Sequence, residues 1–203
     1  MSEGLRVVLE RGFIGASVRD IVVAAGVPQG SFSNHFVTKE AFGLELLERY
    51  AEKIEATLDA TVRNSAFSPQ EALTAYARRN RERLDAEGAS CGCLSGNLSV
   101  EASHHSERIR LALMRIFDVM EAAVLQCFTR ALALGTLPVG SDVASLARAY
   151  VGGLQGAIMM AKLRHSTEPL LCFERSIASF FVKTSEPSSA VSALAIAVAS
   201  RAG

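Results

Sequence analysis

The sequence has no tryptophan and only five prolines among its 203 residues. Alanine and leucine are abundant, and proline, which breaks helices by removing a backbone donor, is scarce, so the composition favours helices. Apolar residues recur at helical spacing, and no alternation typical of a half-buried strand persists. The chain is also long enough to bury a core. We therefore expect an all-α fold.

Cysteine is rare too, and neither a CxxC pair nor a zinc-ligand pattern is formed by Cys91, Cys93, Cys127 and Cys172. The chain does not open with a basic segment followed by a long apolar run. Its most apolar stretches, residues 150–161 and 190–199, are shorter than the roughly 20 residues of a membrane span. We expect a cytoplasmic protein with reduced thiols and without a membrane segment, metal or cofactor.

The chain lacks an excess of positive charge. Its 21 basic side chains match 21 acidic ones, and residues 1–50 hold five basic and six acidic side chains. A DNA-binding domain usually shows a basic excess, because neutralising phosphates supplies much of the affinity. An interpretation as a DNA-binding protein must therefore depend on a motif and on where the charges lie.

Local signals divide the chain into helices. Ser17 with Asp20 three residues later predicts an N-terminal cap, Gly26 predicts a left-handed helix end, and Pro28 predicts the start of the next helix. So tight a turn makes the two helices cross at a large angle. Thr38 is expected to cap a long fourth helix. The first helix is expected to end near residue 11. The helices after it are expected at about 17–25, 28–35, 38–62, 70–86, 94–102, 108–134, 143–163 and 169–182.

These helices suggest two domains and a tail. A three-helix N-terminal domain is expected at residues 1–46, and a helical domain that binds an effector and dimerises at residues 47–184. Residues 185–203 are a low-complexity Ala/Ser/Val segment, for which we favour loose order over an extra helix.

Residues 17–32 read S-V-R-D-I-V-V-A-A-G-V-P-Q-G-S-F and residues 34–41 read N-H-F-V-T-K-E-A. Residues 17–47 resemble the helix-turn-helix of the TetR/AcrR family of transcriptional regulators nearly throughout. The resemblance implies a repressor that binds a palindromic operator as a homodimer and is released by a small-molecule or electrophilic effector. In a helix-turn-helix the second helix enters the major groove.

The same resemblance implies which residues contact DNA. The candidates on the second and third helices and at the start of the fourth are Arg19, Gln29, Gly30, Ser31, Ser33, Asn34, His35 and Lys39. Short polar groups on the third helix would reach base edges, Gly30 would let backbone approach a phosphate, and Arg19, His35 and Lys39 would contact phosphates. The alternative is a solvated polar face. Two departures weaken the match: Ser33 replaces the family's usual Tyr, and the first helix is short.

Residues 91–101, C-G-C-L-S-G-N-L-S-V-E, resemble a G-C-L-x-G-N-L-x-x-E stretch in the regulatory domain of one branch of that family. Some members of the branch respond to electrophiles or oxidants through a cysteine here, which makes Cys93 a candidate thiol sensor. A sensor needs access and a lowered pKa, which a helix start can provide. The alternative is a small residue packed in a turn. Glu101, His104 and His105 share a helix face, but without a second ligand cluster we disfavour a metal site.

Two further sets of residues are candidates for ligand and partner contacts. An effector pocket is predicted to be lined by Tyr76, Asn97, Met114, Phe117, Phe128 and Met159, although such residues at helical spacing also build ordinary cores. Small residues at three- and four-residue spacing on one helix predict a dimer interface at Gly152, Gly153, Gly156 and Ala157. The resemblance places a four-helix interface there, and a helical hairpin within a monomer is the alternative.

Two other classes of function remain. The neutral N-terminal domain and the two departures suggest a helical binding protein that has lost DNA binding. An enzyme is disfavoured, because the sequence shows no Ser/His/Asp or Cys/His arrangement, phosphate loop or convincing carboxylate pair.

Overall fold

The computed structural model describes residues 1–181, and that part of the chain contains nine α-helices, two short 3-10 helices and no strand. The elements are α1 Ser2–Arg11, α2 Val18–Ala24, α3 Gln29–His35, α4 Lys39–Ala60, α5 Pro69–Glu87, η1 Ala89–Cys91, α6 Leu94–Glu101, α7 Glu107–Ala133, α8 Val143–Arg164, α9 Glu168–Ser176 and η2 Ile177–Phe180. The all-α fold class is confirmed. The tail at 185–203 and the expected helix end at 182 lie outside the described residues.

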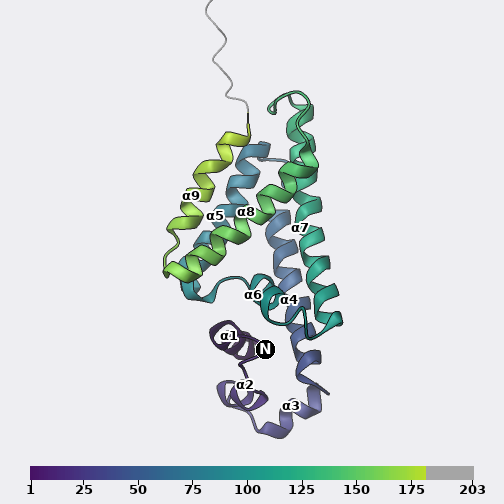
Figure 1. The fold of residues 1–203 in the computed structure, drawn as a ribbon, viewed down its shortest axis with the longest axis vertical. Helices are drawn as coiled ribbons and strands as arrows, with labels where there is room; N and C mark the ends of the chain where they lie inside the picture. Colours follow the sequence, from purple (N-terminus) through teal and green to yellow (C-terminus); the bar gives the residue numbers. More distant parts are fainter. Residues whose placement is uncertain (182–203) are drawn as a thin grey trace, which may run out of the picture.

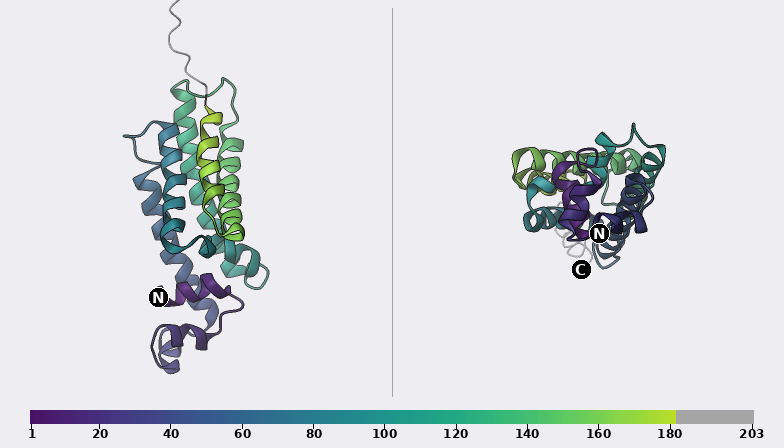
Figure 2. Two further views of the ribbon diagram at one scale, coloured as in Figure 1. Left: turned by 90° about the vertical axis from the view of Figure 1, so that its left-hand side faces the viewer. Right: turned by 90° about the horizontal axis from the view of Figure 1, so that it is seen from below.

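Helices α1, α2 and α3 form a small unit at one end of the elongated molecule, and α4 leads from it into a bundle with α5, α7, α8 and α9 (Figure 1). The short α6 lies at the junction between the small unit and the bundle. Figure 2 shows the bundle helices running along the long axis, with α1 across their lower end. The predicted domain boundary at residues 46 and 47 falls inside α4, so the two parts share this helix.

The predicted helix starts of the small unit are confirmed. The Ser17 side chain accepts a hydrogen bond from the Asp20 N–H, and the Asp20 carboxylate accepts one from the Ser17 N–H, which is a capping box. Thr38 caps α4 by accepting from Ala41 N at 3.0 Å. Gly26 has φ +65°, the left-handed conformation expected of it. A Cβ at this position would meet no atom within 4 Å, so backbone conformation, and not close helix approach, explains this glycine.

Aromatic packing holds α3 against α4. The Phe42 ring lies 5.6 Å from that of Phe32 and 5.2 Å from that of Phe36, between ring centroids. Phe32 and Phe42 are buried, whereas Phe36 is only partly buried. Because Phe42 belongs to α4, a tilt of α4 would carry α3 with it.

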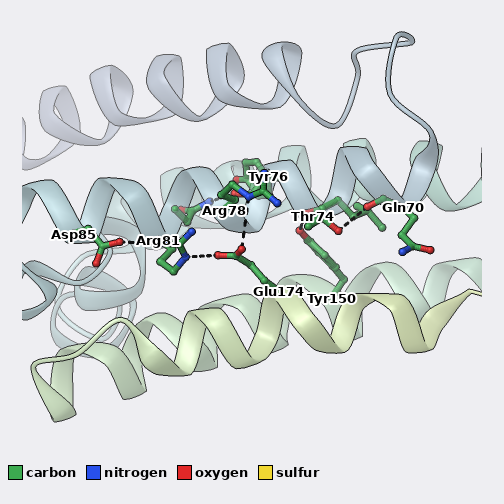
Figure 3. Close-up of polar contacts among 10 residues, drawn as sticks. Gln70, Thr74, Tyr76, Arg78, Arg81, Asp85, Tyr150 and Glu174 are labelled. Carbon is green, nitrogen blue, oxygen red and sulfur yellow. Dashed lines mark hydrogen bonds and ion pairs between the residues drawn. The ribbon is translucent and has the colours of Figure 1, made fainter.

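A nearly buried carboxylate joins α9 to α5 in the bundle (Figure 3). The Glu174 side chain is 7% exposed, and its Oε1 lies 2.6 Å from Arg81 Nε while its Oε2 lies 3.8 Å from Arg78 Nε. On the same helix α5, the Leu73 carbonyl accepts a 2.6 Å hydrogen bond from the fully buried Tyr150 of α8. These contacts fix α5, α8 and α9 as one unit.

Candidate nucleic-acid interface and effector cavity

The outward face of α3 is polar and solvent-exposed. Exposed residues are Gln29, Gly30, Ser33, Asn34 and His35, together with Arg19 on α2, while Ser31 is half-buried. Within residues 1–181, none of these side chains makes a hydrogen bond or an ion pair. Seven of the eight predicted DNA contacts therefore belong to α2 and α3, which lie next to each other at the end of the molecule (Figure 1), and six of the seven are exposed.

Gly30 is one of these surface positions, and its backbone does not require glycine. Its φ lies outside the positive range, and a Cβ placed on it would meet nothing within 4 Å. The packing of the chain itself thus gives no reason for a glycine here. The approach of a phosphate to Gly30 therefore stays a prediction.

Lys39 differs from the other seven because its ammonium is already engaged. Its Nζ donates a 3.2 Å hydrogen bond to the Ile14 carbonyl and lies 4.9 Å from the centre of the Phe13 ring. Partial burial lowers its pKa, and the nearby carboxylates of Glu101 and Asp20 oppose that shift. The structure therefore gives Lys39 a role in holding α4 to the α1–α2 loop, and its contact with phosphate stays a prediction.

The helical bundle touches the same loop through α6. The Glu101 carboxylate accepts a hydrogen bond from Ile14 N at 3.4 Å, and a Cβ on Gly12 would lie 2.6 Å from Glu101 Oε2. Gly12 also has φ +78°, so both its backbone and its neighbour favour glycine. Beside this contact, Glu40 of α4 accepts from Ser106 Oγ, the cap of α7. The corner between α6 and α7 is thus bonded to the DNA-binding part.

Cys93 is the N-cap of α6, as its predicted position near a helix start required. Its Sγ lies 3.2 Å from the Tyr50 hydroxyl and 3.0 Å from Ser95 Oγ. The predicted access is wrong for this conformation, because the residue is only 5% exposed and Tyr50 packs beside it. The packed-turn alternative therefore describes its environment here.

A cavity of about 540 Å³ lies between α1, α4 and α5, close to the start of α6. Its volume falls within the range of small-molecule sites, roughly 300–1,000 Å³. Tyr50, Tyr76 and Leu94 line the side toward Cys93. Leu5 and Leu9 of α1 form another wall, so the cavity borders both parts of the protein.

The residues predicted for an effector pocket are not brought together around this cavity: only Tyr76 lines it. Phe128 is fully buried and contacts the rings of Tyr150, Phe180 and Phe181. Met114 and Met159 are 46% and 63% exposed, Phe117 packs against the core, and Asn97 donates to the Cys91 carbonyl at 3.2 Å. The reasoning from sequence missed Tyr50, Lys53 and Arg83, because helical spacing alone does not reveal which polar side chains of α4 and α5 face each other.

The four small residues of α8 face different surroundings. Gly152 and Gly156 would each have open space around a Cβ, whereas a Cβ on Gly153 would lie 2.8 Å from the Phe173 ring of α9. Ala157 packs against the core. Gly153 therefore serves packing of α8 on α9 within the chain, whereas Gly152 and Gly156 leave room for the approach of a second copy.

Within residues 1–181, no group of three or more His, Cys, Asp and Glu side chains is placed to hold a metal ion. Glu101, which shares a predicted helix face with His104 and His105, instead binds the Ile14 N–H. In the same part of the chain, no helix combines the length and apolar character that crossing a membrane requires.

Comparison with known proteins matches both parts of the chain. Residues 1–46 match the family described as bacterial regulatory proteins, tetR family, and residues 69–177 match the tetracyclin repressor-like C-terminal domain. The HTH-type transcriptional repressor DhaR of Mycobacterium sp. (strain GP1) is 36% identical over 84% of this chain and 84% of its own. The transcriptional regulator AcuR of Cereibacter sphaeroides is 34% identical over 88% of this chain and 82% of its own.

Solved structures agree with this assignment. The regulatory protein TetR from Rhodobacter sphaeroides superimposes with a TM-score of 0.83 and 33% identity, covering 89% of this chain and 96% of that one. The reduced form of Escherichia coli NemR superimposes with a TM-score of 0.80 and 26% identity, covering 91% and 96%. The chain therefore belongs to the TetR family of bacterial transcriptional regulators.

Proposed function

We propose that this protein is a repressor that binds a palindromic operator as a homodimer in the cytoplasm and leaves the DNA when an effector binds. The observation that carries the proposal is the outward face of α3, where Gln29, Ser33 and Asn34 are exposed and unused by the described part of the chain. Side chains of this kind form hydrogen bonds with base edges in a major groove. Because residues 1–50 hold one more acidic than basic side chain, such placed contacts must supply a large share of the affinity.

A dimer would form through the exposed face of α8. Gly152, Gly156, Met159 and Leu163 follow one another at helical spacing, and the last two are 63% and 73% exposed. Small residues let a second helix approach, and the large apolar side chains supply area to bury. A twofold axis through this face would present two copies of α3 to successive major grooves, about 34 Å apart.

A structural change that releases DNA would be transmitted through α6. Cys93 begins this helix and Glu101 ends it, and Glu101 holds the α1–α2 loop through Ile14. An electrophile that modified Cys93 would add atoms to a site already filled by Tyr50 and Ser95. Overpacking of this kind forces nearby backbone to shift, which would pull Glu101 away from the loop.

The direct test is selection of bound DNA from a random pool with the purified chain. We expect an enriched inverted repeat whose half-sites lie one helical turn apart. A variant with Gln29→Ala and Asn34→Ala should enrich no such repeat, whereas Asp118→Ala, at an exposed position of α7 in the bundle, should enrich the same one. Failure of the unmodified chain to enrich any sequence would instead favour a helical ligand-binding protein without DNA binding.

A further inference from the structure

The walls of the 540 Å³ cavity combine apolar area with charge. Leu5, Leu9, Ile54 and Leu94 provide apolar surface from three different helices. Three basic side chains, Lys53, Arg79 and Arg83, and two acidic ones, Glu82 and Glu87, also line the cavity. The lining of this site, which has the size of a small-molecule site, therefore carries one excess positive charge.

The three basic side chains differ in whether they already bind acceptors within the protein. Arg83 donates to Glu87 at 2.9 Å and to the Gly92 carbonyl at 3.0 Å, so its guanidinium is held at one end of the cavity. Lys53 and Arg79 are exposed, and within residues 1–181 no carboxylate lies within ion-pair distance of either. These two cations are available to a ligand, and a carboxylate is a matching partner for both.

The apolar wall belongs partly to the DNA-binding part of the protein. Leu5 and Leu9 are one helix turn apart on α1 and are both partly buried against the core. The same helix packs on α2, whose capping Ser17 lies next to the loop that Glu101 holds. A molecule in the cavity would therefore touch α1 directly and would not need α6 to influence the position of α2 and α3.

We propose that this cavity is the effector site and that its ligand is a small organic anion, a carboxylate on an apolar body. Lys53 and Arg79 bind the carboxylate, and the apolar body lies against Leu5 and Leu9. The proposal that filling the cavity releases DNA rests on the repressor function proposed above. The ligand class does not, because binding can be measured without DNA.

The absence of tryptophan allows a clean reporter of occupancy. A Leu9→Trp variant carries a single tryptophan in the cavity wall, and Leu5→Trp offers a second position on the same wall. Leu134→Trp, at a site 62% exposed beyond the end of α7, is the control. The probes are straight-chain carboxylates from butanoate to decanoate, and the amide of each length is the uncharged counterpart.

We expect carboxylates to change the emission of Leu9→Trp saturably, the amides to do so at least about tenfold more weakly, and Leu134→Trp to stay silent. Lys53→Gln with Arg79→Gln should weaken carboxylate binding about tenfold. The matched Arg78→Gln, whose side chain faces Glu174 and not the cavity, should leave binding unchanged. Bound carboxylate should also weaken binding of the selected operator, and the double variant should lose this response.

Equal binding of carboxylates and amides, or unchanged affinity in the Lys53 and Arg79 double variant, would overturn the ligand class. Silence of both Leu5→Trp and Leu9→Trp across the whole series would overturn the site. A saturable signal in a protein that selects no DNA would instead refute the repressor function and leave the ligand class standing.

Discussion

The backbone N–H of Ile14 donates a 3.4 Å hydrogen bond to the carboxylate of Glu101, 87 residues further along the chain. This contact joins the loop between α1 and α2 to the end of α6. A Cβ on Gly12 would lie 2.6 Å from the same carboxylate, so the loop closes around it. This hydrogen bond is thus a second connection between the DNA-binding part and the regulatory part, separate from the helix α4 that they share.

Glu101→Ala should uncouple the two parts. Operator affinity without effector should change little, but an electrophile that modifies Cys93 should release less DNA, because its influence through α6 has lost the loop contact. Glu101→Gln keeps an acceptor for the Ile14 N–H and should retain most of the response. Operator titrations with and without effector measure the difference. Full release from the Glu101→Ala protein would contradict this role.

Gly12→Ala should destabilise the fold for two separable reasons. The residue must adopt φ +78° with ψ 156°, a conformation essentially confined to glycine that costs about 1–3 kcal/mol, and its methyl group must displace the Glu101 carboxylate. In a Glu101→Ala background the second cost disappears and the first remains. A double-mutant cycle by urea unfolding should therefore show a coupling of about 0.5–1.5 kcal/mol. Additive effects would mean that the two residues do not touch in solution.

Glu174→Ala should destabilise the bundle by about 1–3 kcal/mol, because it removes the nearly buried partner of Arg81, whose side chain is 24% exposed, and leaves only the exposed Asp85 at 3.0 Å. The matched control is Glu168→Ala on the same helix. Its carboxylate lies 3.6 Å from Arg164 with both side chains 58% exposed, and such surface pairs contribute little. Urea denaturation compares the two variants. Equal losses of stability would show that burial of Glu174 adds nothing.

Prediction from sequence succeeded where the signal is local and failed where it depends on packing between helices. Ser17, Thr38 and Gly26 act through the next few residues, and the structure places all three as expected. Met114 and Met159 have apolar side chains at helical spacing, yet both are exposed. The spacing gives one apolar face, and it cannot distinguish a face against the core from one open to solvent or to a second subunit.

The cavity shows the same limit. Four arginines occur between residues 78 and 83, at 78, 79, 81 and 83. Arg81 binds Glu174 of α9, whereas Arg79 and Arg83 line the cavity next to α4. Their identities are alike, and only the packing of α5 between its two neighbours assigns them different roles.

Gly152→Leu and Gly156→Leu should shift the protein from dimer toward monomer without unfolding it, since a Cβ at either position would meet no atom of its own chain within 4 Å. Gly153→Leu should instead lower the stability of the subunit, by about 1–3 kcal/mol, because Phe173 occupies the space that the new side chain needs. Sedimentation velocity and urea unfolding separate the two effects. A monomeric unmodified protein at micromolar concentration would refute the interface.

Thiol labelling should follow exposure. N-ethylmaleimide should modify the exposed Cys172 first and Cys127 last. Burial raises the pKa of the Cys127 thiol to about 11, so little of its thiolate exists at neutral pH. Raising the pH toward 11 should accelerate labelling of Cys127. Tyr50→Ala should speed labelling of Cys93, which Tyr50 covers, and should leave Cys172 unchanged. Mass spectrometry of labelled peptides gives each rate. An unchanged rate at Cys93 would contradict shielding by Tyr50.

We propose that the side chains on the outward face of α3 bind the base edges of an operator. Fluorescence anisotropy with the selected inverted repeat and a scrambled duplex, for the unmodified chain and for Gln29→Ala, tests it most directly. We expect Gln29→Ala to weaken binding to the repeat by about 1–3 kcal/mol and to leave binding to the scrambled duplex unchanged, because a base contact depends on the DNA sequence and a phosphate contact does not. Equal affinity of the unmodified chain for both duplexes, or an equal loss on both from the substitution, would contradict it.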